Sequence, residues 1–167
     1  MEWADERVSK LSHVDSRNRP TMVDVGDKAV TERTAKARAV VVFPVDAAPE
    51  RDAELRTKKG PVFDTAIVAG VMAAKRTHEL IPFCHSLPLD GCEIRIDWGA
   101  DGEVEIECSV RATHKTGVEM EALTGASVAA LTVYDMCKAL THGIRIREVV
   151  LVEKTGGKRD YRRAESR

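Results

Sequence analysis

The sequence has few aromatic residues, and this scarcity narrows the functions that it can serve. Phe, Trp and Tyr make up 4% of its 167 residues. RNA-recognition domains stack bases on aromatic side chains of their central strands, and the predicted strand from Val104 to Val110 contains none. The 26 basic and 27 acidic residues nearly cancel, so no global field attracts DNA or an anionic membrane. We therefore expect no nucleic-acid or membrane partner.

Long apolar runs and paired cysteines are also missing. No run approaches the roughly 20 apolar residues that a membrane-spanning helix needs, and the charged first ten residues lack the apolar core of a signal peptide. We therefore expect a cytoplasmic protein. The four cysteines form no CxxC pair, and two fall on the apolar phase of predicted strands, which favours reduced, mostly buried thiols over a disulfide or zinc framework. They are Cys84, Cys92, Cys108 and Cys137.

The length and the 43% hydrophobic content are enough for one buried core. Residues 1–20 are polar and end at Asn18-Arg19-Pro20, which is typical of a flexible leader. We expect a single domain over residues 21–160, followed by a flexible tail over residues 161–167.

Hydrophobic periodicity predicts six main elements. Alternating apolar residues on either side of Gly99-Ala100-Asp101-Gly102 predict a β-hairpin. Apolar residues at helical spacing predict two helices, the first ended by Pro82 and the second followed by Gly143. The predicted elements are a strand over 35–43, a charged linker over 46–57, a helix from 61 to 82, strands over 92–98 and 104–110, a helix over 119–140 and a strand over 144–154. This order is the βαββαβ pattern of an α+β, ferredoxin-like fold, an antiparallel sheet with both helices on one face.

The segment from Ile81 to Leu89 holds Cys84 and His85 between two prolines. Proline restricts its own backbone and that of the preceding residue, so this connection is stiff and not helical. A rigidly presented imidazole suits proton transfer or ligand recognition. A capping or core histidine accounts for the residue equally well.

Asp135 and Lys138 have the i, i+3 spacing that places both on one face of a helix. An ordinary surface ion pair explains this spacing without catalysis. Glu121 lies fourteen residues before Asp135, which is about 21 Å along a continuous helix. The two carboxylates therefore cannot share a compact pocket within one chain. If both serve one site, a partner chain must supply one of them, which predicts an isologous dimer.

Three lysine-bearing loops lie next to predicted helix or strand ends. They are Lys58-Lys59-Gly60-Pro61, Lys115-Thr116-Gly117 and Lys154-Thr155-Gly156-Gly157-Lys158-Arg159. Glycines let the backbone approach an anion and lysines supply charge, although the spacing differs from the P-loop signature. Solvated surface lysines explain each loop taken alone.

Taken together, these motifs resemble the molybdenum cofactor biosynthesis protein C (MoaC) family, the cyclic pyranopterin monophosphate synthases. The resemblance covers residues 11–158. It is carried by Met22-Val23-Asp24-Val25, Lys59-Gly60, Ala74-Lys75-Arg76-Thr77, Leu80-Ile81-Pro82-Phe83-Cys84-His85, Lys115 to Leu123, Tyr134-Asp135-Met136-Cys137-Lys138 and Lys154-Thr155-Gly156-Gly157-Lys158.

The resemblance implies a lyase that converts cyclised dihydro-GTP to cyclic pyranopterin monophosphate and releases pyrophosphate. It also implies a homohexamer, a trimer of dimers with composite sites at the dimer interface. By position, the catalytic residues fall on Asp135, Lys138, His85, Lys59 and Lys154. The substrate-binding residues fall on Phe83, Cys84, His85, Glu119, Met120, Glu121, Lys115 and Lys158.

The chemistry of this reaction suits these residue types. Asp135, Lys138 and His85 could move protons around carbon–nitrogen bonds, and Lys59 and Lys154 could stabilise the charge of departing pyrophosphate. Glu119 and Glu121 could accept hydrogen bonds from the guanidine-like edge of the substrate.

No cofactor is expected. No protein-bound metal is expected either, because the sequence has no dense carboxylate cluster. Assistance by Mg²⁺ in the departure of pyrophosphate is left open. Three residues depart from the family pattern: Ser86, His114 and Arg159. The main alternative is a non-catalytic module that binds a nucleotide or small anion and does not need Asp135.

Overall fold

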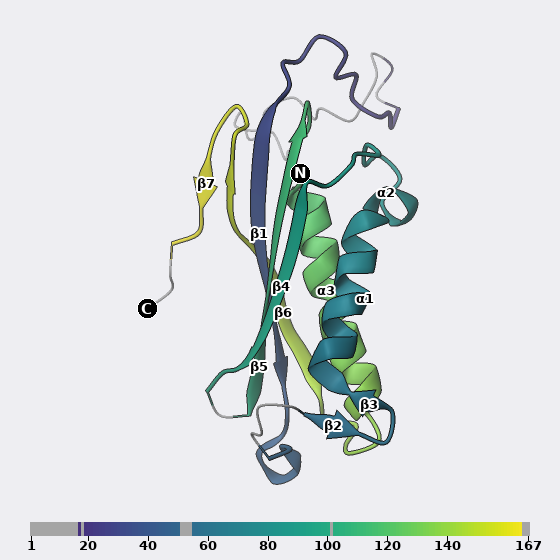
Figure 1. Cartoon of the computed structure of the whole chain (residues 1–167), viewed down its shortest axis with the longest axis vertical. Coiled ribbons are helices and arrows are strands. Elements are labelled where there is room, and N and C mark those ends of the chain that lie inside the picture. The colour runs from purple at the N-terminus through teal and green to yellow at the C-terminus, as the bar shows by residue number, and fades with distance from the viewer. Residues whose placement is uncertain (1–16, 18, 51–54, 101, 165–167) are drawn as a thin grey trace, which may run out of the picture.

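A five-stranded antiparallel sheet with two long helices packed on one face forms the molecule (Figure 1). The computed structural model describes residues 17, 19–50, 55–100 and 102–164. The predicted βαββαβ order is confirmed. Its elements are β1 (Thr31–Val42), α1 (Val62–Lys75), β4 (Gly91–Trp98), β5 (Glu103–His114), α3 (Glu119–Cys137) and β6 (Arg145–Thr155). No helix among the described residues is long and apolar enough to cross a membrane.

The sheet has the order β4-β5-β1-β6-β7, where β7 (Tyr161–Arg162) is a short edge strand. β1 lies in the middle and pairs antiparallel with both β5 and β6. Its alternate residues Ala35, Ala37, Ala39 and Val41 are buried. Because side chains of a strand alternate between the two faces, these residues lie under the helices and form the centre of the core.

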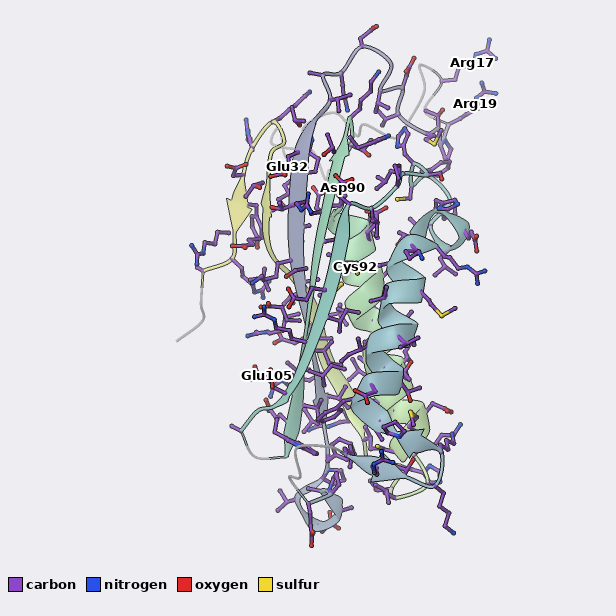
Figure 2. The ribbon with its side chains drawn as sticks, viewed as in Figure 1. Arg17, Arg19, Glu32, Asp90, Cys92 and Glu105 are labelled. Carbon is purple, nitrogen blue, oxygen red and sulfur yellow. The ribbon has the colours of Figure 1, made fainter. Side chains whose placement is uncertain are left out.

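The other face of the sheet is polar and carries ion pairs between neighbouring strands. Lys36 of β1 binds Glu107 of β5 at 3.0 Å, and Arg38 of β1 binds Glu148 of β6 at 2.8 Å. Figure 2 shows Glu32 and Glu105 on this side of the sheet, away from the helices. All four cysteines are free; Cys108 and Cys137 are buried, and Cys84 and Cys92 are half-buried.

Four element boundaries differ from the prediction by more than one residue. β1 begins at Thr31 rather than residue 35, β5 ends at His114 rather than residue 110, and α3 ends at Cys137 rather than residue 140. The first helix ends at Lys75, and a separate short helix, α2 (Thr77–Leu80), precedes Pro82. The buried Thr77 hydroxyl lies 3.3 and 3.0 Å from the carbonyl oxygens of Ala73 and Ala74. A side chain that hydrogen-bonds these carbonyls competes with the regular helix ladder, which accounts for the break.

The segment expected to be a charged linker is partly ordered. It contains a 3₁₀ turn, η1 (Val45–Ala47), and β2 (Arg56–Thr57), which pairs with β3 (Gly60–Pro61). Leu55 is buried against the core. Most of the expected leader, residues 1–16 and 18, lies outside the described residues. Two residues of the expected tail, Tyr161 and Arg162, form β7.

α1 and α3 approach each other closely at two glycines. A Cβ atom added to Gly70 would lie 2.8 Å from the carbonyl oxygen of Gly125 and 2.3 Å from Cδ1 of Ile94. Real Cβ atoms do not come so near to backbone, so the helices must separate to admit it. We expect Gly70→Ala to lower the free energy of unfolding by about 1–3 kcal/mol, because overpacking exceeds the gain in helix propensity.

Chemical denaturation of the two forms measures this loss. Gly91→Ala is the matched control, because the nearest atoms to its added Cβ are those of Arg111, 3.7 Å away. An unchanged unfolding midpoint in Gly70→Ala would show that the helix contact is looser than described.

Candidate active site

The predicted site residues form two groups at opposite ends of α3. One group lies at the C-terminal end of the helix, beside the β2–β3 hairpin, and the other lies at its N-terminal end, near α2 (Figure 1). The first group contains Lys59, Asp135 and Lys138. The second contains Cys84, His85, Lys115, Glu119, Glu121 and Lys154.

The β2–β3 hairpin presents Lys59 to the end of α3. Gly60 has a φ of 114°, a conformation that glycine adopts without the steric cost of a side chain, and this sharp turn places Lys59 next to the helix. The Lys59 Nζ atom donates to Asp135 Oδ2 at 2.7 Å and to the Asp135 carbonyl oxygen at 2.9 Å. An ammonium group at a helix C-terminus also complements the helix dipole.

The Asp135 carboxylate is bound by two ammonium groups at once. Lys138 Nζ lies 2.7 Å from Oδ1, while Lys59 Nζ occupies Oδ2. Hydrogen bonds from Lys138 and then from Lys59 lower the pKa of Asp135 to about 2, and the bond to Asp135 raises the pKa of Lys138. The three side chains are about half exposed, so they form a fixed array of charges that a ligand can reach.

At the other end of α3, Cys84 and Glu121 form a partly buried pair. The Cys84 Sγ atom donates to Glu121 Oε1 at 3.3 Å. Burial, and then the charge of Glu121, raises the pKa of the Cys84 thiol to about 12. Cys84 is therefore a neutral thiol at physiological pH, which suits a hydrogen-bond donor and not a nucleophile.

Glu121 is the most deeply buried carboxylate of the candidate site. Only 3% of its surface is exposed, and its Oε2 atom has no hydrogen-bond partner among the described residues. Burial raises its pKa. An unpartnered buried acceptor in a polar cluster is costly for folding, so its presence here points to a ligand with an N–H or O–H donor.

We expect Glu121→Gln to raise stability and to lower activity. The raised pKa means that the folded state holds a proton which the unfolded chain has released, so wild-type stability falls as pH rises above the ordinary carboxyl value of about 4. Removing the charge should therefore raise the melting temperature by about 2–4 °C at pH 8, for a gain of about 1 kcal/mol, and by less at pH 5.

Thermal melts at the two pH values test this expectation. Glu119→Gln is the control, since Glu119 is paired with a lysine and its neutralisation should give no gain. Equal melting temperatures of wild type and Glu121→Gln at both pH values would contradict a charged, buried Glu121.

The segment from Met22 to Gly26 lies against the second group. His85 Nε2 is 2.8 Å from the Val23 carbonyl oxygen. A carbonyl only accepts, so Nε2 carries the hydrogen. Lys115 Nζ donates to the Gly26 carbonyl oxygen at 2.6 Å. These two contacts hold a segment that is far from the helices in sequence beside the site.

Glu119 and Lys154 connect the start of α3 to the end of β6. Lys154 Nζ donates to Glu119 Oε1 at 2.8 Å. The Glu119 carboxylate folds back over Gly117, where an added Cβ would lie 1.9 Å from Oε2. Gly117 therefore leaves the space that this ion pair occupies.

The remaining predicted residues are exposed at the same end of the molecule. Phe83 and Met120 are 40% and 38% exposed, and Lys158 lies on the exposed turn between β6 and β7. Sequence reasoning missed Arg33. Its Nε and Nη2 atoms donate to the carbonyl oxygens of His114 and Lys115 at 3.4 and 3.5 Å. A single arginine among the consecutive polar residues that begin β1 does not indicate these contacts.

The structure thus joins the predicted residues into two groups and keeps the groups apart. The helix that separates Glu121 from Asp135 is continuous, so their separation of about 21 Å holds. No group of three or more His, Cys, Asp or Glu residues suited to a metal ion occurs in the described part of the chain.

Comparison with known proteins gives consistent matches. The model of the MoaC family matches residues 22–157. The cyclic pyranopterin monophosphate synthase of Xanthomonas axonopodis pv. citri is 58% identical over 158 residues, which cover 94% of this chain and 96% of that protein. The synthase of Xanthomonas campestris pv. campestris strain B100 is 59% identical over 153 residues, with 91% and 93% covered. Molybdenum cofactor biosynthesis protein 1 of Dictyostelium discoideum is 44% identical over 168 residues, which cover 90% of this chain and 27% of that protein.

Proposed function

The chain belongs to the MoaC family and is a cyclic pyranopterin monophosphate synthase of molybdenum cofactor biosynthesis, and we propose that its substrate is cyclised dihydro-GTP. In this reaction the guanine-derived ring opens and is rebuilt as a pterin, and formation of the cyclic phosphate expels pyrophosphate. The observation that carries the assignment of the site is the Asp135 carboxylate held between Lys59 and Lys138. A surface helix gains little from such an array, whereas proton transfer and anion stabilisation both need one.

Proton transfer falls to the group at the C-terminal end of α3. Asp135 is charged at neutral pH because its pKa is about 2, so it serves to hold and orient the two ammonium groups. Lys138 and Lys59 are then the proton donors and the cationic partners of developing negative charge.

Substrate recognition falls to the group at the N-terminal end of α3. The unpartnered Oε2 atom of Glu121 can accept from the guanidine-like edge of the base, beside the neutral Cys84 thiol. The basic residues Lys115, Lys154 and Lys158, together with Arg33, can bind the phosphates. Any Mg²⁺ that takes part would arrive with those phosphates, and no step above requires it.

The two groups can meet only across an interface between two chains. An exposed stripe of α3 runs between them and includes Met120, Leu131, Asp135 and Lys138, which follow helical spacing. Leu131 is 56% exposed, and burial of its side chain against a second chain would be favourable. We propose that this stripe packs antiparallel on the same stripe of a second chain, with the two-fold axis near Val128, so that Glu121 faces Asp135 of the partner subunit.

Three such dimers form the hexamer that we propose for the assembly, and each dimer then contains two composite sites. In the dimer, the isologous contact brings together the two groups of site residues that the length of α3 keeps apart within one chain.

Incubation of the purified protein with enzymatically generated cyclised dihydro-GTP tests the function. We expect pyrophosphate release together with the fluorescent pterin that forms on oxidation of the product. Tight binding of the substrate without either signal would overturn the assignment and identify a binding module.

A further inference from the structure

The segment from Met22 to Gly26 supplies none of the predicted site residues, yet it lies beside them. Figure 1 shows the chain before β1 (dark purple) running from the start of that strand to the side of the molecule that carries α2. The segment contacts two site residues, His85 and Lys115, and it makes both contacts with backbone carbonyls. Its backbone can therefore determine how these two side chains are presented.

The Val23 carbonyl determines which nitrogen of the His85 ring carries a hydrogen. Nε2 lies 2.8 Å from the Val23 oxygen, and because that oxygen can only accept, the hydrogen is on Nε2. In a neutral imidazole the other ring nitrogen then carries none. Nδ1 is therefore the atom through which His85 can accept a proton or a hydrogen bond from the substrate, and the position of the Val23 carbonyl fixes the orientation of the ring.

The Gly26 carbonyl holds Lys115 in a similar way. Lys115 Nζ donates to this oxygen at 2.6 Å. An ammonium group has three hydrogens, so two remain for the phosphates of the substrate. A free lysine side chain has many rotamers, and fixing one of them costs entropy. A contact that fixes the side chain before the substrate arrives removes that cost from binding.

The Asp24 side chain stabilises the turn that carries both carbonyls. Its Oδ1 atom accepts from Gly26 N at 2.8 Å, which is the Asx turn that Asp and Asn form with the backbone two residues on. A Cβ atom added to Gly26 would lie 3.2 Å from the same oxygen, so the carboxylate lies directly against the turn. Lys28 N extends the turn by donating to the Val25 carbonyl oxygen at 3.1 Å. The carbonyls of Val23 and Gly26 belong to the two ends of the Asx turn, so its loss would move both.

We propose that Asp24 is a positioning residue of the synthase reaction, which acts through the Val23 and Gly26 carbonyls to orient His85 and Lys115 toward the substrate. This inference rests on the proposed roles of His85 and Lys115 in the site. The turn requires a side-chain oxygen that accepts a hydrogen bond, and it does not require a negative charge, because Asn forms the same turn. This requirement distinguishes positioning from a direct contact between the carboxylate and a charged ligand.

Two substitutions at residue 24 separate the acceptor from the charge. Asp24→Ala removes the acceptor, and we expect kcat/KM for cyclised dihydro-GTP to fall by about 10- to 100-fold, because misplacing reacting groups by about 1 Å has an effect of this order. Asp24→Asn keeps the acceptor and should stay within about twofold of the wild type. Asp27→Ala is the matched control, because it removes an exposed carboxylate from the same part of the chain. An Asn variant as impaired as the Ala variant would overturn the proposal and assign the effect to the charge.

Nitrogen-15 NMR of the His85 ring measures the positioning without substrate. The two ring nitrogens of a neutral histidine give different signals according to which one carries the hydrogen, and the signals of His85 are those missing from the spectrum of His85→Ala. With the imidazole deprotonated, we expect the Nε2–H tautomer alone in the wild type and in Asp24→Asn, and a mixture of both tautomers in Asp24→Ala. Circular dichroism confirms that each variant is folded.

Two results of these spectra would overturn the proposal. One is a single Nε2–H tautomer in Asp24→Ala, and the other is a mixture of tautomers without loss of activity. Because the spectra require no turnover, they would still report the tautomer of His85 if the protein bound the substrate without converting it. Failure of the synthase assignment and failure of the role of Asp24 are therefore distinguishable.

Discussion

Replacement of Asp135 by Asn is expected to lower turnover by about 10²- to 10⁴-fold, the range in which positioned proton transfer contributes to catalysis. The carboxylate accepts one charged hydrogen bond at each oxygen, from Lys138 and Lys59. An amide can accept at only one atom and presents an N–H group to the other ammonium. Both lysines would lose their charge partner and one of them its side-chain acceptor, while the helix would keep a residue of the same shape.

Folding and substrate binding should survive this change. Asp135 is about half exposed, so its neutralisation leaves no buried charge, and the base-binding group lies at the other end of α3. Pyrophosphate release, calorimetric substrate binding and far-ultraviolet circular dichroism measure the three properties on one preparation. Asp64→Asn provides the control, because Asp64 is an exposed carboxylate in the first turn of α1. Near-normal turnover in Asp135→Asn would remove the residue from the mechanism.

The pKa of Asp135 also predicts which pH changes leave the array intact. A carboxyl whose pKa is lowered on folding stabilises the folded state above its unfolded value, and this contribution is lost as pH falls through about 2. Asp135 therefore stays charged throughout the range in which an enzyme of this kind is assayed. A decline in activity below pH 7 would reflect the protonation of a side chain other than Asp135.

The sequence alone predicted the elements whose hydrophobic pattern is complete within a short segment. The hairpin of β4 and β5 alternates apolar and polar residues on both sides of a glycine-rich turn, and α3 has an unbroken helical pattern. The start of β1 was not predictable in this way. Thr31, Glu32, Arg33 and Thr34 are all polar, and they form a strand because β5 pairs with all four and β6 pairs with Thr34. The two-residue strands β2, β3 and β7 have partners only a few residues away, but they are too short to show the alternation that predicts a strand.

The same distinction applies to the candidate site. The i, i+3 spacing predicts the contact between Asp135 and Lys138, and the structure confirms it at 2.7 Å. Lys59 reaches Asp135 from 76 residues away, and Lys154 reaches Glu119 from 35 residues away. No spacing rule predicts such pairs, and only the resemblance of the motifs placed them in one family of sites. Arg33 was missed because its contacts are to backbone carbonyls, which every residue has and which therefore give no sequence pattern.

Mixing two inactive variants is expected to restore activity if the sites are composite. Asp135→Asn damages the group at the C-terminal end of α3, and His85→Ala damages the group at the N-terminal end. In a dimer that contains one chain of each kind, one composite site carries both changes and the other carries neither. Random exchange makes half of the dimers mixed, so we expect about a quarter of wild-type turnover from two proteins that are each inactive.

A second mixture tests whether recovery requires that the two changes lie in different groups of site residues. Asp135→Asn combined with Lys138→Ala places both changes in the same group, so every composite site keeps at least one of them and no activity should return. Exchange is achieved by joint refolding from denaturant, and refolded wild type sets the reference. Recovery in neither mixture would mean that each chain builds its site alone. Because α3 is continuous between Glu121 and Asp135, one chain cannot bring the two groups together. One of the groups would then be structural. Recovery in the first mixture only would require that Asp135 and His85 serve one substrate from two chains, as an antiparallel contact between α3 stripes predicts.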